Sequence, residues 1–314
     1  MASSIRVYDA DETAALLPYP QLAAEIGNTL KDTAAGHVSA LERATTGLPG
    51  DGTFLLMGAA DQRLAIAKVG AVHPTNSAEG LPTISASVIV TDATNGQVKA
   101  LLDGATVTVR RTSALSLYGA TQVGARAGTV FMVGAGAQAT GHLEALHAGI
   151  GIGQLYVSSR TAARAQQVVQ RALELGVSAE VVTDPAAALE HAASADLIVT
   201  TTNSRTPVLP SELAGRLKPE ATIVAVGAYR HDTAEIPPAV VAACDVVVDT
   251  LAGAEEEAGD LIQAADAGAW SWDQARERRD VLGGVERSGR PVLVKTVGHS
   301  MWDLAAARLA VPPT

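Results

Sequence analysis

The second half of the sequence predicts a doubly wound α/β fold, in which helices cover both faces of a parallel sheet. From Thr129 onward, short apolar runs alternate with alanine-rich stretches of helical length. The apolar runs are rich in valine and isoleucine, as strands buried on both faces are. Strands are expected at residues 130–133, 155–157, 180–182, 197–200, 223–226 and 246–249. Helices are expected at residues 140–148, 162–175, 185–193, 212–217 and 238–243.

The first part of the chain predicts a smaller α+β domain. Its strands are linked as hairpins, and the Asp, Asn and Gly residues of Asp92–Gly96 predict the turn before the last strand. One helix around residues 22–32 is expected to lead the domain. The amphipathic stretch 301–309 is expected to pack back on this domain or on the hinge. Strands are expected at residues 53–56, 64–68, 85–91 and 98–102.

Length, composition and charge limit the kind of protein. A chain of 314 residues, 47% of them hydrophobic, can bury two domain cores without disulfides. We expect one domain at residues 1–115, with 299–314 returning to it, and a second at 116–298. The net charge of -10 argues against binding of nucleic acid or an anionic membrane, since both are bound through clustered cations. A small-molecule ligand is the expected partner.

The sequence also predicts a cytoplasmic protein. The N-terminus carries no signal-peptide pattern, and no uncharged apolar run is long enough to span a membrane. The single cysteine, Cys244, lies in an apolar run, where a buried thiol in a reducing compartment is expected.

The most specific motif is a glycine-rich turn that follows a predicted strand and opens a predicted helix. Gly134 allows the tight turn, Gly136 lets a pyrophosphate approach the backbone, and Ala139 still permits close packing of the helix on the strand. Ala137 and Gln138 complete the phosphate-binding turn. A tight turn without a ligand is the alternative, but the βα repeats that follow favour a Rossmann-type dinucleotide-binding domain.

The end of the second predicted strand selects the cofactor. Dinucleotide-binding folds that take NAD place an Asp or Glu there to bind the ribose 2′-hydroxyl. This chain has Ser159, Arg160 and Thr161 instead, which are suited to a 2′-phosphate. NADPH is therefore predicted, with NADH possible because several NAD-specific folds also lack the acid. The alternative for Arg160 is a loop position in solvent.

Two more strand ends contribute candidate cofactor contacts. Thr200, Thr201 and Thr202 follow the fourth predicted strand, at the carboxyl edge where open α/β sheets bind ligands. Val226 and Gly227 end the fifth strand. Their expected position is beside the nicotinamide ribose, although polar residues leaving a strand also serve as ordinary turn residues.

Three cations of the first domain form a candidate carboxylate site. Lys68 ends an alternating apolar run, Arg111 lies where a helix is expected to begin, and Arg43 precedes a threonine-glycine loop. Each taken alone is typical of a solvated rim. Together they predict a clamp, because guanidinium groups bind carboxylates bidentately and a helix start adds amide donors.

No metal site is predicted. His142, His147 and His191 lie on predicted helices and are not paired with a carboxylate at metal-ligand spacing. Packing or surface roles are expected for them. Glu255–Glu257 predicts a solvated helical face.

Six ordered motifs resemble the ornithine cyclodeaminase and mu-crystallin family over nearly the whole chain. They are Lys68-Val-Gly70, Gly80-Leu-Pro-Thr83, Asp92–Gly96, Arg111-Thr-Ser-Ala114, Gly134-Ala-Gly-Ala-Gln138, and Lys295-Thr-Val-Gly298 followed by Asp303. The resemblance implies a homodimer formed through the N-terminal, substrate-binding domains. It implies that Arg43, Lys68 and Arg111 hold the substrate carboxylate. Thr83 would lie beside them, and Gly298 near the nicotinamide.

One loop departs from the ornithine cyclodeaminases of that family. They carry an acid and a lysine after the fifth strand, and these positions are Tyr229 and Thr233 when the loop is anchored on Glu235. A tyrosine cannot supply the carboxylate that would bind and deprotonate an ornithine amine. The loop is more similar to that of the family's imine reductases, with Tyr229 in the substrate pocket. Asp232 is a second candidate acid if the loop is shifted.

The expected reaction is hydride transfer from NADPH to a small cyclic ketimine carboxylate. Δ1-Pyrroline-2-carboxylate would give proline, and Δ1-piperideine-2-carboxylate would give pipecolate. Lys68 and Arg111 are the expected catalytic residues, because they orient the substrate and a buried lysine can deliver a proton. An amino-acid dehydrogenase of the alanine type and an ornithine cyclodeaminase are the competing enzymes. A non-catalytic, NADPH-dependent ligand carrier is the competing class.

Overall fold

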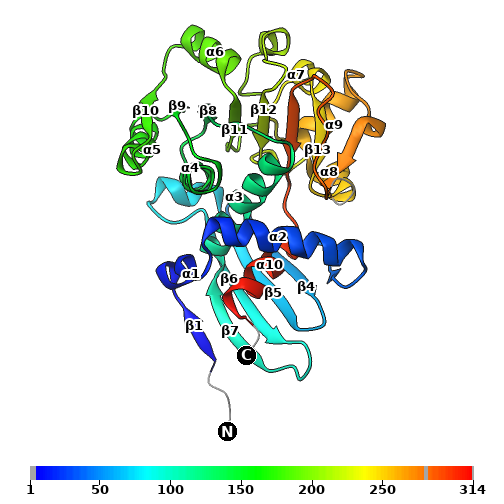
Figure 1. Cartoon of the computed structure of the whole chain (residues 1–314). Coiled ribbons are helices and arrows are strands. Elements are labelled where there is room, and N and C mark those ends of the chain that lie inside the picture. The colour runs from blue at the N-terminus through cyan, green and yellow to red at the C-terminus, as the bar shows by residue number, and fades with distance from the viewer. Residues whose placement is uncertain (1–4, 279–281, 313–314) are drawn as a thin grey trace. The chain divides into compact units, whose positions relative to one another are not determined.

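A computed structural model of the chain describes residues 5–278 and 282–312. The chain divides into two compact units, which are drawn in Figure 1. Unit 1 comprises residues 1–115 and 299–314, and unit 2 comprises residues 116–298. Among the described residues, no helix is both long and apolar enough to cross a membrane.

Unit 1 is built on a mainly antiparallel sheet. Its strands follow the order β1-β7-β6-β5-β4-β2, with β3 paired to β4 and only β1 running parallel to its neighbour. The bounds are β1 (Arg6–Tyr8), β2 (Ser39–Ala40), β3 (Ala44–Leu48), β4 (Gly52–Ala60), β5 (Leu64–Val72), β6 (Ile84–Asp92) and β7 (Val98–Asp103). The four predicted hairpin strands are confirmed. The expected threonine-glycine loop after Arg43 is wrong, because residues 44–48 form β3 on the edge of β4.

One face of this sheet is buried. Met57, Lys68, Val88 and Leu102 occupy one row across β4 to β7, and all four side chains are buried. The neighbouring residue in each strand points to the opposite face, since side chains alternate along a strand. Lys68 is therefore a charged group in the middle of an apolar layer.

Helices cover the buried face. The helical segments of unit 1 are α1 (Ala10–Leu16), α2 (Tyr19–Ala34), the 3₁₀ turn η1 (Pro74–Ala78), the start of α3 (Gly104–Gln122) and α10 (Ser300–Ala310). α10 packs against α2, β4 and β5, as Figure 1 shows, so the expected return of residues 301–309 to the first domain is confirmed. The single helix expected at the start is incomplete. α1 precedes α2 and begins with a reciprocal capping box between Asp9 and Glu12.

The expected helix start at Arg111 is also wrong. α3 begins at Gly104, where the Asp103 carboxylate accepts the amide of Thr106 (2.7 Å). Residues 105–109 read Ala-Thr-Val-Thr-Val, a β-branched run that favours a strand on propensity, and tertiary packing overrides that preference. Arg111 thus lies in the helix interior and gains nothing from an N-terminal dipole.

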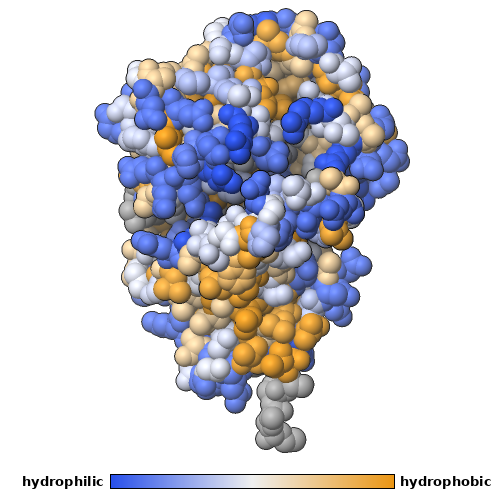
Figure 2. All heavy atoms as spheres, turned by 180° about the vertical axis from the view of Figure 1, so that it is seen from behind, coloured by the Kyte–Doolittle hydropathy of each residue, from blue (hydrophilic) through white to orange (hydrophobic). Residues whose placement is uncertain are grey.

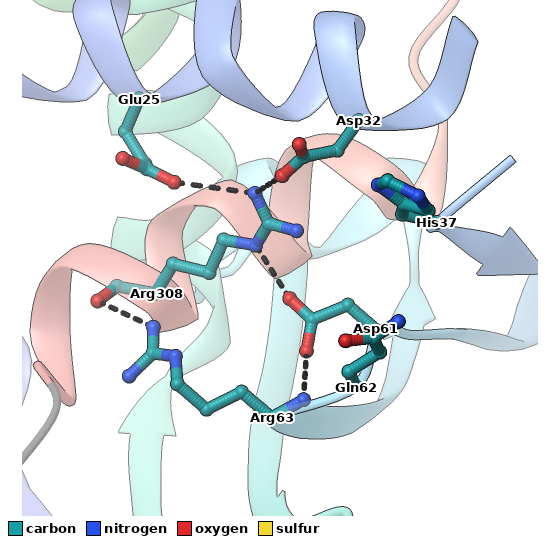
Figure 3. Close-up of a pocket in the computed structure, with 7 residues that line it drawn as sticks. All are labelled: Glu25, Asp32, His37, Asp61, Gln62, Arg63 and Arg308. Atoms are coloured by element: carbon teal, nitrogen blue, oxygen red, sulfur yellow. Dashed lines mark hydrogen bonds and ion pairs between the residues drawn. The ribbon is translucent and has the colours of Figure 1, made fainter. Parts of the chain in front are cut away.

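A charged clamp fixes α10 within unit 1 (Figure 3). The Arg308 guanidinium reaches the Asp61 carboxylate after β4 (2.6 Å) and two acids of α2, Asp32 (2.8 Å) and Glu25 (3.4 Å). Arg63 donates to the Val311 carbonyl at the end of α10 (2.6 Å). Although partial burial opposes it, backbone amides and the Arg308 charge hold the pKa of Asp61 below its usual range. These contacts of Arg308 and Arg63 fix the position of α10 on the sheet, and hence the places where its other side chains contact the strands.

Unit 2 is a doubly wound sheet of eight parallel strands in the order β10-β9-β8-β11-β12-β15-β13-β14. The strands are β8 (Thr129–Val133), β9 (Gln154–Ser158), β10 (Ser178–Val181), β11 (Leu197–Thr200), β12 (Thr222–Ala225), β13 (Asp245–Val248), β14 (Ala275–Glu277) and β15 (Val292–Lys295). The six predicted strands are confirmed, and β14 and β15 are additional. The strand order reverses between β8 and β11, which is where open α/β sheets bind ligands.

Helices pack on both faces of this sheet. They are α4 (Ala137–Ile150), α5 (Ala162–Glu174), α6 (Pro185–Ser194), α7 (Pro238–Ala243), α8 (Leu251–Glu257) and α9 (Gly259–Asp266). The 3₁₀ turns η2 (Ser211–Gly215) and η3 (Trp272–Gln274) complete the unit, so the α-helix expected at 212–217 is corrected to a short 3₁₀ turn. Phe131, Ile198 and Ile223 share one core with Val240 of α7 and Leu261 of α9.

Candidate functional site

The glycine-rich turn lies at the switch point of the unit 2 sheet. Gly134 has φ +114°, and a Cβ there would lie 2.5 Å from the Thr201 hydroxyl oxygen, so only glycine fits. Gly136 is the N-cap of α4, and a Cβ on it would meet nothing within 4 Å. Open space in front of a helix N-terminus with free amide donors fits a pyrophosphate. These residues therefore suit a dinucleotide.

The adjacent strand end brings the predicted 2′-phosphate residues beside this turn. The Gly134 amide donates to the Ser158 carbonyl (2.9 Å), which joins the ends of β8 and β9. Ser159 follows directly, Arg160 is exposed, and Thr161 is the N-cap of α5. The loop presents a hydroxyl and a guanidinium next to the phosphate turn.

The ends of β11 and β12 approach each other closely. A Cβ on Gly227 would lie 1.8 Å from the Thr202 carbonyl oxygen. Thr200 is wholly buried, and its hydroxyl donates to the Glu235 carboxylate (2.9 Å), which turns it inward. Thr201 and Thr202 are partly exposed at this edge.

Three other residues of unit 2 that are predicted to contact the cofactor or the substrate differ in burial and in hydrogen bonding. Val226 is buried and donates its amide to the Thr200 carbonyl (3.1 Å). Gly298 has φ +88°, a left-handed conformation that favours glycine, and donates to the Asp249 carboxylate (3.0 Å). Tyr229 has 38% of its surface exposed in the loop after β12.

A buried cluster of charges forms in unit 1. The Lys68 ammonium, on β5, donates to the Asp303 carboxylate of α10 (2.9 Å) and to the Thr108 hydroxyl of α3 (2.6 Å). The Arg111 Nε lies 3.8 Å from the same Asp303 oxygen. Lys68 is 3% exposed, Arg111 7% and Asp303 0%. The solvated-rim interpretation therefore does not hold for Lys68 or Arg111.

Arg43 belongs to the same cluster electrostatically. Ala44 pairs with Leu56, so Arg43 comes just before β3, level with Met57 and hence with Lys68 in the row across the sheet. Burial lowers the pKa of Lys68, the Arg111 and Arg43 charges act in the same direction, and Asp303 opposes them. The structure thus brings together all three predicted cations.

Thr83 is placed differently. It precedes β6, and its carbonyl accepts the amide of His73 (2.8 Å). Lys68 pairs with Val88. Val88 is five positions after Thr83, which corresponds to a rise of roughly 17 Å along the strand. The backbone of Thr83 is therefore not level with the cation cluster.

Asp303 and Thr108 are the site residues that sequence reasoning did not assign. Asp303 stands inside a run of buried apolar side chains of α10, and a carboxylate in that setting signals a buried cationic partner. That signal is present in the sequence. The sequence does not identify the partner, because Lys68 lies 235 positions away along the chain.

Unit 2 is a Rossmann-type unit whose phosphate-binding turn lies at the switch point of its sheet, and unit 1 carries a buried cation cluster with one carboxylate. These features define a two-unit, dinucleotide-binding α/β protein. The chain belongs to the ornithine cyclodeaminase/mu-crystallin family, whose sequence profile matches residues 6–310.

Relatives in two bacteria match almost the whole chain. A Δ(1)-pyrroline-2-carboxylate reductase 1 of Burkholderia multivorans is 40% identical, over 97% of this chain and 94% of that protein. A Δ(1)-pyrroline-2-carboxylate/Δ(1)-piperideine-2-carboxylate reductase of Azospirillum brasilense is 41% identical, over 98% and 96%.

Solved structures share the fold. The Δ(1)-pyrroline-2-carboxylate reductase of Thermococcus litoralis, in complex with NADH and L-proline, superposes with a TM-score of 0.89 at 23% identity, covering 98% of this chain and 96% of that one. An archaeal alanine dehydrogenase dimer with bound NAD superposes with a TM-score of 0.86 at 25% identity, covering 98% and 94%.

Proposed function

We propose that this protein reduces a small cyclic ketimine carboxylate with a nicotinamide dinucleotide, converting Δ1-pyrroline-2-carboxylate to proline or Δ1-piperideine-2-carboxylate to pipecolate. The observation that carries the proposal is the buried pair of cations, Lys68 and Arg111, around Asp303, with the Arg43 charge acting on Lys68. The chain is also about 40% identical to two such reductases. A bound nicotinamide dinucleotide supplies the hydride.

The cations hold the substrate carboxylate. Arg111 offers a planar fork that matches a carboxylate, and Lys68 has three N–H donors of which Thr108 and Asp303 take two. Fixing the carboxylate orients the attached C=N bond, and orientation of the reacting carbon is most of what the protein must supply.

Asp303 balances the charge of the cluster. A protonated imine accepts hydride better than a neutral one, yet the surrounding cations oppose that positive charge. The Asp303 carboxylate, wholly buried and in contact with Lys68 and Arg111, offsets them. Lys68, whose pKa burial lowers, gives up a proton more readily than an exposed lysine and is the proposed donor to the imine nitrogen.

Ornithine cyclodeamination fits the structure less well. Asp232, the alternative acid of the loop after β12, is held by the Arg230 guanidinium (3.0 Å) and lies 3.7 Å from Arg205. Despite some desolvation, these charges keep the pKa of Asp232 below its usual range. A weak base engaged with an arginine is a poor group to deprotonate an amine.

NADPH is the proposed preferred cofactor. Support comes from Ser159, Arg160 and Thr161 beside the phosphate turn, where an acidic residue would repel a 2′-phosphate. Arg160→Ala is expected to raise the Kd of NADPH on the order of 10-fold and to leave that of NADH nearly unchanged. Equal losses for both nucleotides would rule out this role for Arg160.

The proposed assembly is a homodimer formed through unit 1. Among the described residues of this unit, five large hydrophobic side chains are exposed, and Figure 2 shows hydrophobic side chains gathered over its part of the surface. They are Ile5, Val7, Leu41, Leu56 and Leu81. Val7 on β1 and Leu56 on β4 lie on the sheet face opposite Lys68, and exposed apolar side chains on that face support an interface there.

A substrate panel tests the activity. Purified protein is incubated with NADPH or NADH and either cyclic imine, and nucleotide oxidation is followed by absorbance with chiral analysis of the product. Parallel reactions contain pyruvate with excess ammonia, or ornithine with NAD. Imine reduction without the other two activities is expected. Ammonia release from ornithine, or nucleotide binding without any turnover, would contradict the proposal.

A further inference from the structure

Three charged side chains are wholly buried at the carboxyl edge of the unit 2 sheet. They are Glu235 in the loop before α7, Asp260 in the first turn of α9, and Lys295 at the end of β15. Lys295 Nζ lies 2.7 Å from the Asp260 carboxylate. No side chain of this trio belongs to the cation cluster of unit 1 or to the phosphate turn.

The Glu235 carboxylate ties two strand ends together. One oxygen accepts the amide of Thr202, just beyond β11. The other accepts the amide of Gly227, beyond β12 (2.7 Å), and the hydroxyl of Thr200 (2.9 Å). The sheet ladder stops at these positions, so the carboxylate replaces the missing strand as hydrogen-bond acceptor.

Asp260 and Lys295 hold Glu235 in turn. The Asp260 carboxylate accepts the backbone amides of Glu235 and Ile236, while Lys295 balances the two acids. Burial raises the pKa of Glu235, and the Lys295 charge opposes that shift. The result is a chain of contacts from β15 and α9 to the loop tips of β11 and β12.

Stability alone does not account for this arrangement. Buried ion pairs cost desolvation, and well-packed apolar side chains of the same volume are often as stabilising or more so. What the charges add is a fixed backbone geometry at Thr202 and Gly227, where a Cβ on Gly227 would already overlap the Thr202 carbonyl. A fixed backbone at these two residues is useful if they contact a bound ligand.

We propose that Glu235, Asp260 and Lys295 form a positioning network for the nicotinamide half of the bound dinucleotide. This inference rests on the proposed dinucleotide-dependent function. The sheet order reverses between β8 and β11, so one mononucleotide half lies over β8 and β9 and the other over β11 and β12. The network holds only the second pair of strand ends.

Ligand fragments distinguish positioning from general support. Glu235→Gln keeps the side-chain size but replaces one acceptor oxygen by an NH₂ group, so either Thr202 or Gly227 loses its acceptor. Kd values for NADPH, NADH and ADP, which ends at the pyrophosphate, are measured by calorimetry. The dinucleotide Kd values are expected to rise on the order of 10-fold, and the ADP Kd by less than about twofold.

Two further variants keep the test decisive. Thr200→Val removes one hydrogen bond to Glu235 without touching a charge, so a smaller shift in the same direction is expected if Glu235→Gln does not fold. Asp196→Asn is the matched control. Asp196 accepts the Thr129 amide (2.9 Å) and pairs with Lys218 (2.7 Å) at the opposite edge of the sheet. The Asp196→Asn substitution should therefore lower Tm and leave the Kd values for NADPH, NADH and ADP unchanged.

The outcomes separate cleanly. A rise in the dinucleotide Kd values with ADP unchanged supports the positioning role. Equal losses for ADP and dinucleotide, or a lowered Tm with all Kd values unchanged, would overturn it. Failure of the proposed function would appear instead as absence of imine reduction by the wild-type protein, which these binding measurements do not involve.

Discussion

The two buried charge clusters of this protein are built in different ways. In unit 2, backbone amides donate to the carboxylates of Glu235 and Asp260, the Thr200 hydroxyl also donates to Glu235, and Lys295 is the counter-ion. In unit 1, Lys68 and Asp303 are met by side chains, and cations outnumber acids. A cluster whose carboxylates are held mainly by backbone amides fixes the local backbone structure. A cluster of side chains with surplus positive charge is suited to receive an anion.

Removal of Arg111 is the strongest test of the unit 1 cluster. Arg111→Ala is expected to lower kcat/KM for the cyclic imine on the order of 10³-fold, because truncating one partner of a buried charge interaction costs several kcal/mol. The Kd of NADPH should stay nearly constant. Arg110→Ala is the control, since its guanidinium stacks on Tyr19 instead (4.3 Å), and it should keep kcat/KM. Loss of nucleotide binding in Arg111→Ala would assign this residue to the other site.

Neutralising Asp303 should give a smaller effect with a pH signature. Asp303 raises the pKa of Lys68, so Asp303→Asn lowers that pKa further below its ordinary value. If the ammonium form is active, the alkaline limb of the kcat/KM profile moves to lower pH, and activity at pH 8 falls on the order of 10²-fold. Steady-state assays from pH 5 to about pH 10 measure this. An unmoved alkaline limb would contradict the charge-balancing role.

Unlike the two charge clusters, a third buried titratable group, His142, is neutral in the folded protein. His142 of α4 is wholly buried between the Ser116 hydroxyl (2.9 Å) and the Gln138 carbonyl (2.7 Å), and burial lowers its pKa to about 4. The folded state therefore binds this proton less tightly than the unfolded state. The unfolded state takes up this proton near pH 6.5, whereas the folded state does so only near pH 4. The free energy of unfolding is therefore highest above pH 6.5 and falls by about 3 kcal/mol as the pH drops to 4.

His142→Gln removes that dependence and keeps an amide that can bond Ser116. Urea unfolding of both proteins from pH 7 to pH 4 provides the comparison. The difference in unfolding free energy between wild type and variant should shrink by about 3 kcal/mol over this range. A constant difference would mean that the folded protein accommodates the imidazolium.

Local patterns made most of the fold predictable. The glycine turn, the six valine- and isoleucine-rich strands and the hairpins of unit 1 all follow from short-range rules, because each depends on residues within a few positions. α3 shows where such rules fail. Its β-branched first turns form a helix because Asp103 accepts the Thr106 amide and Val107 is buried in the core.

The sequence by itself predicted a dinucleotide-binding strand-turn-helix motif and a carboxylate site made of three cations. Only the tertiary structure decided that Lys68 meets Asp303, and that Glu235 meets Asp260 and Lys295. Periodicity reports which face of an element is buried, but it carries no information on which distant element covers that face. The pairing of buried charges is set by that packing, since an ion in the core is tolerated only beside the partner that the fold delivers.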